Sequence, residues 1–71
     1  MKEEYVRHLF KLMSSHTDAT IEATIDHLCY GTSQQKAADK QKLPQSTIGR
    51  AVSRIRETDQ LVIEAIMIKI S

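Results

Sequence analysis

Three apolar residues spaced five apart, Ala38, Leu43 and Ile48, limit the folds open to this chain more than any other feature. Pro44 stands between the last two, and a proline disfavours helical backbone at the residue before it. A helix-turn-helix needs a small residue where its helices meet, a tight turn, and buried apolar side chains that fix the second helix. The spacing therefore predicts this motif over residues 34–55.

The length and composition of the chain agree with a small helical fold. Its 71 residues make one domain at most, residues 1–71, and 41% hydrophobic with 27% charged residues are usual for a folded domain. Apolar residues recur at helical spacing, and the first such stripe consists of Val6, Leu9, Phe10 and Met13. We predict an all-α domain of about five helices.

A second helix is expected after a break at residues 14–17. Thr17 or Asp18 can cap its first turn, and Gly31 can take the left-handed conformation that ends a helix. With no activating partner evident, Cys29 is expected to act as a small buried hydrophobe. The apolar stripe of this helix comprises Ile21, Thr24, Ile25, Leu28 and Cys29.

Two more helices form the predicted motif. Thr32 and Gln35 have the spacing of a capping box, which predicts a third helix through about Lys40. Pro44 suits the first positions of a fourth helix that ends near Arg56. The fourth helix is expected to bury Ile48, Ala51, Val52 and Ile55, with Leu43 packed on Ile48 as a hydrophobic staple.

The end of the chain, residues 57–71, is far more apolar than the rest. Eight of the ten residues at positions 61–70 are apolar and many are β-branched, so a strand is an alternative to the expected helix. A domain this small cannot cover them all, which predicts an oligomerisation segment and a homo-dimer or higher oligomer. The alternative is that the segment closes the monomer core. The predicted contacts between subunits are Leu61, Val62, Ile66 and Ile70.

Basic charge is concentrated in the predicted motif. Residues 32–56 hold six of the ten basic residues and one of the nine acidic ones, although the whole chain has a net charge of only +1. Such a concentration favours neutralisation of nucleic-acid phosphates. A solvated basic face is the alternative interpretation.

Several other classes of protein are not expected. The histidines His8, His16 and His27 do not have the spacing of a zinc site, and the chain has neither a phosphate loop nor a nucleophile elbow. We therefore predict no enzymatic activity, no cofactor and no small-molecule substrate. The sequence has no apolar run of membrane-spanning length and no signal-peptide pattern, which predicts a cytoplasmic protein without a membrane partner.

The segment from Gln34 resembles the helix-turn-helix of the lambda-type phage repressors. The resemblance implies that Gln45 and Ser46 read bases and that Gln34 helps to clamp a phosphate. This chain has Gln41 where a core hydrophobe is usual and Lys42 where the turn glycine usually lies. The matching residues are Gln34, Ala38, Asp39, Lys40, Gln45, Ser46 and Gly49.

Over residues 14–61 the chain also resembles the PapB family of fimbrial (adhesin) biosynthesis regulators. The resemblance includes the polar run at residues 14–16, a helix ending at Gly31, and a start at Ser33 and Lys36. It also includes residues 46–50 and 53–56, and its most specific part is the step from Gly49 to Arg50. It implies a bacterial transcription factor that controls a fimbrial operon and binds AT-rich DNA as an oligomer.

Arg50 is the strongest candidate for a base contact, either to guanine or in the narrow groove of an A-tract, so the groove that is read stays open. Arg54, Arg56 and the lysines Lys36, Lys40 and Lys42 are expected to contact phosphates. An alternative function is a helix-turn-helix protein-interaction module such as an antitoxin or adaptor. The complete predicted DNA-binding set is Gln34, Lys36, Lys42, Gln45, Ser46, Thr47, Arg50, Ser53, Arg54 and Arg56.

Overall fold

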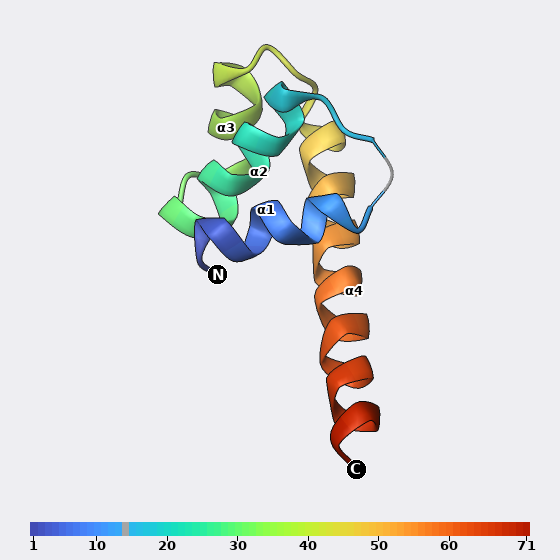
Figure 1. The fold of residues 1–71 in the computed structure, drawn as a ribbon. Coiled ribbons are helices and arrows are strands. Elements are labelled where there is room, and N and C mark those ends of the chain that lie inside the picture. Colours follow the sequence, from blue (N-terminus) through green and yellow to red (C-terminus); the bar gives the residue numbers. More distant parts are fainter. Residues whose placement is uncertain (14) are drawn as a thin grey trace.

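A computed structural model describes residues 1–13 and 15–71, and these residues form four α-helices (Figure 1). Ser14, in the predicted break after the first helix, lies outside the described residues. The all-α prediction is confirmed for the described part of the chain. The helices are α1 (Glu3–Lys11), α2 (Asp18–Tyr30), α3 (Gln34–Lys40) and α4 (Gln45–Ile70).

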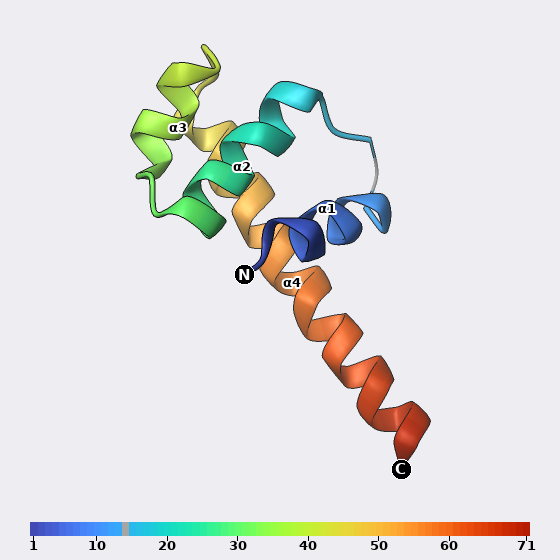
Figure 2. The same cartoon turned by 60° about the vertical axis from the view of Figure 1, so that its left-hand side comes forward.

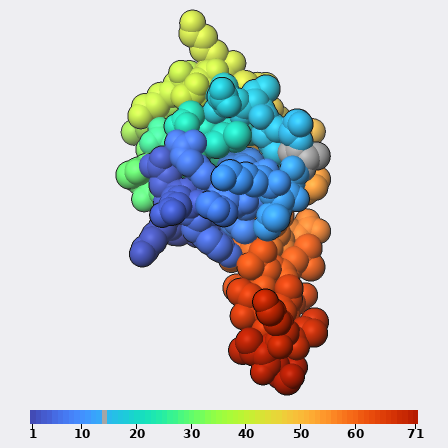
Figure 3. Space-filling model, viewed as in Figure 1, coloured from blue at the N-terminus to red at the C-terminus, as the bar shows by residue number. Residues whose placement is uncertain are grey.

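The helix α4 has two halves with different surroundings. Helices α1 to α3 gather beside its first part, residues 45–56, which we call the inner half (Figure 1). The remainder, residues 57–70 or the outer half, projects away from the other helices, as a second view and the molecular surface also show (Figures 2 and 3). This projection makes the molecule elongated, with extents of 44 × 23 × 17 Å.

The prediction of about five helices is wrong at one junction. A helix ending near Arg56 and a separate apolar segment were expected, but α4 runs without interruption through 26 residues from Gln45 to Ile70. No glycine or proline follows Gly49 in the sequence, so nothing in the backbone stops the helix after Arg56. The alternative of a terminal strand is also wrong, because residues 61–70 are helical.

The predicted ends of α2 are confirmed. Thr17 is the N-cap residue, and its side-chain oxygen accepts a hydrogen bond from the backbone N–H of Thr20 at 3.2 Å. Gly31 has a φ of 77°, the left-handed conformation that glycine adopts without steric cost. Its N–H and that of Thr32 both donate to the carbonyl oxygen of Asp26, which closes the helix.

The predicted capping box of α3 is wrong by one residue. Ser33 is the N-cap, and its hydroxyl oxygen accepts from the backbone N–H of Lys36 at 3.2 Å. Thr32 instead donates its hydroxyl to the Asp26 carboxylate at the end of α2, at 3.2 Å. Because Thr32 is engaged by the preceding helix, the next hydroxyl in the chain caps α3, and Gln35 extends forward along the helix.

Two clusters of buried side chains hold the four helices together, and the inner half of α4 contributes to both. The first joins α1 to α2 and α4, and the second joins α2 to α3 and α4. This places the inner half at the centre of the fold, as the spacing of its apolar residues predicts. The first cluster contains Val6, Leu9, Phe10, Ile25 and Ile55, and the second contains Ala23, Ala37, Ala38, Ile48 and Val52.

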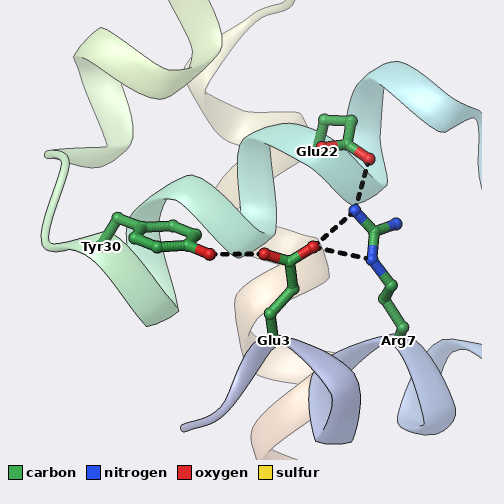
Figure 4. A network of polar contacts seen from close by, with 4 residues as sticks. All are labelled: Glu3, Arg7, Glu22 and Tyr30. Carbon is green, nitrogen blue, oxygen red and sulfur yellow. Dashed lines mark hydrogen bonds and ion pairs between the residues drawn. The ribbon is translucent and has the colours of Figure 1, made fainter.

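Polar contacts add a second link between α1 and its neighbours. Glu3 accepts from Arg7 and from the Tyr30 hydroxyl at 2.5 Å, while Arg7 also pairs with Glu22 at 2.8 Å (Figure 4). The hydrogen bond from Tyr30, together with the Arg7 guanidinium, lowers the pKa of Glu3. Glu3 and Arg7 of α1 thus bind Tyr30 and Glu22 of α2. The network has a structural role, because it joins the two helices.

Candidate nucleic-acid interface

Small residues let α3 lie close against its neighbours. Ala37 and Ala38 are completely buried, and they pack with Ala23 of α2 and Ile48 of α4 in the second cluster. Alanine side chains permit short distances between helix axes, and close contact fixes the angle between α3 and α4. Ala23 was not among the predicted core residues. Its position one residue before Thr24 and two before Ile25 was the available signal.

The turn between α3 and α4 uses lysine where a glycine was expected. Lys42 has a φ of 56° and is the one residue other than glycine with positive φ among those described. The N–H of Lys42 donates to the carbonyl of Asp39 at 3.1 Å, and that of Leu43 donates to the carbonyl of Ala38 at 2.9 Å. This is the bonding pattern of a Schellman motif. The chain therefore forms a tight turn although it has Lys42 where the turn glycine usually lies.

The inner half of α4 presents a shallow groove on the side away from the core. It has a volume of about 440 Å³ and is lined by five residues. Three of them are small, Arg50 lies about one helical turn after Ser46, and Arg54 lies about one turn after Arg50. We call this the α4 groove, and its lining residues are Ser46, Gly49, Arg50, Ser53 and Arg54.

Gly49 lies where α3 approaches α4. A Cβ atom built at Gly49 would lie 3.4 Å from Oε1 of Gln34, which is an ordinary van der Waals contact. The fold itself therefore does not require glycine here. Glycine in a helix interior costs about 1 kcal/mol relative to alanine, so its presence keeps the groove open at a cost in helix stability.

The basic residues of this region are largely free of ion pairs. Lys40 pairs with Asp26 at 3.3 Å, whereas none of the three ion pairs among the described residues involves Arg50, Arg54 or Arg56. All three arginines are exposed. Exposed guanidinium groups that are not held in an ion pair can form bidentate hydrogen bonds with phosphate or with a base edge.

The structure brings only some of the predicted DNA-binding residues together. Ser46, Arg50, Ser53 and Arg54 line one groove, and Gln34 borders it at Gly49. Thr47 is half-buried, and Arg56 lies about 200° around the helix from Arg54, since each residue advances by about 100°. Exposed residues outside the groove are Lys36, Lys42, Gln45 and Arg56.

The predicted oligomerisation residues differ in exposure. Val62 is half-buried and packs against the first core cluster, whereas Leu61, Ile66 and Ile70 are exposed. The exposed fractions of Leu61 and Ile70 are 58% and 77%, so the alternative that this segment closes the monomer core is wrong for them. Leu12, at the end of α1, is 68% exposed and was not predicted as part of this surface.

Other parts of the described chain lack the features of a reactive or metal site. No cluster of three or more potential metal ligands exists among residues 1–13 and 15–71. Cys29 is half-buried against the first cluster, and burial raises the pKa of its thiol, which keeps it protonated. In the same residues, no helix has the length and apolar character needed to cross a membrane.

Comparison of the chain with protein-family models, with curated proteins and with solved structures gives no match.

Proposed function

We propose that this protein is a sequence-specific DNA-binding transcriptional regulator that acts as a homo-oligomer. The supporting observation is the α4 groove, in which Arg50 and Arg54 are exposed, and form no ion pair with the described residues, beside the small residues Ser46, Gly49 and Ser53. In helix-turn-helix proteins the second helix presents such a face to base edges, while the first lies across the backbone. Arg50 is the proposed base-reading residue.

The proposal extends to the surroundings of the groove. Gln34 borders it from the first turn of α3, and its side chain is the proposed phosphate clamp. Lys36, Lys42 and Arg56 are exposed on other sides of the motif and would add phosphate contacts that are independent of sequence. Control of a bacterial fimbrial operon in the cytoplasm, as the PapB resemblance implies, is part of this proposal.

The outer half of α4 supports assembly. Its exposed apolar side chains surround the helix, and a helix that is apolar on all sides is normally buried by neighbours. In the proposed mechanism, several copies occupy neighbouring sites on AT-rich DNA and thereby block or assist polymerase. Neither a cofactor nor a small-molecule substrate enters this mechanism.

Replacement of Arg50 by alanine tests the base contact. We expect Arg50→Ala to weaken binding to the promoter of the protein's own gene by about 5- to 150-fold, since a lost bidentate contact costs about 1–3 kcal/mol. Lys2→Ala is the matched control, because it removes an exposed positive charge outside the motif. Fluorescence anisotropy with labelled promoter DNA gives both affinities. Wild-type affinity and sequence preference in Arg50→Ala would contradict the assignment.

Salt dependence separates DNA from an apolar protein partner, such as the target of an antitoxin or adaptor. Each released counterion contributes to the decrease of DNA affinity with salt, so the logarithm of the affinity should fall linearly with that of the salt concentration. An apolar protein interface is nearly insensitive to the same change. Binding that persists unchanged as salt rises would favour the interaction module.

A further inference from the structure

The outer half of α4 has a stripe of mostly apolar residues, here called the seam, with one charged residue on each side. Between positions 61 and 70 only Glu64 and Lys69 are charged, and they are five residues apart. Residues five apart lie about 140° from each other around a helix. On the narrower side between these two charges lie Leu61, Ala65 and Ile68, and Thr58 continues the seam one turn earlier.

We propose that two copies of this chain pair through this seam with their α4 helices parallel and in register. In heptad terms, Thr58 and Ala65 occupy a positions, and Leu61 and Ile68 occupy d positions. Glu64 is then at position g and Lys69 at the e position of the next heptad. In a parallel pair these two positions are neighbours across the interface, so Glu64 of each copy lies beside Lys69 of the other.

The charges select this orientation. An antiparallel pair through the same seam places g positions beside g positions and e beside e, so Glu64 of one copy and Lys69 of the other lie on different sides of the interface and cannot pair. A parallel pair shifted by one heptad moves each charge away from its partner. Only the parallel, in-register pair forms two symmetric ion pairs, and ion pairs at these positions set partner choice and orientation.

A groove at the base of the outer half shares lining residues with the seam. It has a volume of about 420 Å³ and lies between the end of α1 and α4. Thr58, Leu61 and Ala65, three of the four seam residues, line it, and Leu12 forms its apolar rim. A second α4 helix on the seam would cover these side chains. The rest of the lining consists of Met13, Arg54, Glu57 and Val62.

This pairing rests on the proposed assembly through α4, and it specifies how the two DNA-reading faces are arranged. Arg54 lies one heptad before Leu61 and lines both grooves. In a parallel pair the Arg54 side chains of both copies face the common axis at the same end of the assembly. Their mutual repulsion makes the inner halves diverge, and phosphates placed between them would relieve it. An antiparallel pair would instead place the two reading faces at opposite ends.

Disulfide cross-linking without DNA tests the orientation. The parallel pair predicts that Leu61→Cys, in a Cys29→Ala background, forms a covalent dimer with itself. Gln60→Cys in the same background is the control, because residue 60 lies about 100° around the helix from Leu61, outside the seam, and this variant should stay monomeric. A cross-link between Leu61→Cys and Ile68→Cys chains, with none between two Leu61→Cys chains, would overturn the parallel arrangement.

Charge exchange tests the ion pairs in the full chain. Glu64→Lys and Lys69→Glu should each weaken pairing about tenfold, because two exposed ion pairs become repulsive. The double variant restores both pairs and should recover the cross-linking and the sedimentation behaviour of the parent. Failure of the double variant to recover would overturn the Glu64–Lys69 contact.

DNA binding is measured separately, so the two proposals fail differently. A wild-type chain that sediments at the 8.1 kDa of one copy at all concentrations would overturn the pairing and leave DNA reading by Arg50 untouched. A chain that pairs but does not bind promoter DNA would overturn the proposed DNA-binding function and leave the proposed pairing intact. With both correct, promoter DNA increases the cross-linking of Leu61→Cys.

Discussion

The inner and outer halves of α4 belong to one uninterrupted helix but differ in how their apolar residues are distributed. In the inner half, Ile48, Val52 and Ile55 lie on one side and are buried, while the opposite side carries the α4 groove. In the outer half, apolar residues occur on all sides and most are exposed, while Val62 packs against the first core cluster. The helix is therefore stabilised by its own domain at one end and needs other chains to cover its apolar residues at the other.

The largest expected difference between the halves comes from replacing one isoleucine in each of them. Ile48→Ala empties a completely buried site and should lower the free energy of unfolding by about 2–5 kcal/mol. Ile66→Ala, at a residue that is 53% exposed, should change it by less than about 0.5 kcal/mol in dilute protein. Urea denaturation measures both. Equal losses would mean that the two halves are stabilised in the same way.

Deletion of residues 61–71 separates folding from assembly. We expect the remaining body to fold with a loss of about 1 kcal/mol, because the deletion removes Val62, which packs against the first core cluster. Self-association should be lost, and sedimentation together with the DNA footprint measures that loss. A truncated chain with the mass and footprint of the parent would remove the outer half from the proposed assembly.

Gly49→Ala separates helix stability from DNA affinity within the inner half. The added methyl group fits at 3.4 Å from Gln34, so helix propensity should raise the stability by about 0.5–1 kcal/mol. The same methyl group enters the α4 groove, and affinity for promoter DNA should fall severalfold. Thermal unfolding and anisotropy give the two values. A more stable variant with unchanged DNA affinity would show that the groove floor does not approach DNA.

The smallest expected effect lies at the junction between the halves, where Tyr5 of α1 donates its hydroxyl to the carboxylate of Asp59. This hydrogen bond raises the pKa of Tyr5 above its ordinary value of about 10. A raised pKa in the folded state means that the contribution to stability is complete below about pH 10 and is lost as the pH rises through the higher value.

Tyr5→Phe should therefore cost well under about 1 kcal/mol at neutral pH, because solvent reaches the pair. The stability difference from the wild type should shrink above about pH 10. Urea titrations at several pH values measure this. A difference that stays constant across this range would assign the effect of Tyr5 to packing alone.

Local signals predicted most helix ends correctly because the relevant contacts are made within a few residues. Thr17 and Gly31 bound α2 as expected, since a side-chain cap and a left-handed glycine act within one turn. The error at Thr32 has a longer-range cause. Its hydroxyl bonds to Asp26 of the preceding helix, so the competition between Thr32 and Ser33 for the cap was decided by a neighbouring element.

The sequence was enough to predict which segment of the chain holds the candidate site, but not which of its residues form one surface. Spacing of Ala38, Leu43 and Ile48 predicted two packed helices, and the concentration of basic residues pointed to the same segment. Which of those residues line one groove depends on the angle between α3 and α4. That angle placed Gln34 beside Gly49 and left Thr47 half-buried.

The sequence by itself determined the helical class, the core stripes of α1 and of the inner half of α4, and the position of the turn, because periodicity, proline and capping residues act locally. The tertiary structure decided the rest. It joined the last two predicted elements into one helix, let Lys42 take a left-handed conformation, and left the outer half of α4 uncovered. These outcomes depend on which surfaces meet in space, and packing between distant segments can outweigh local preference.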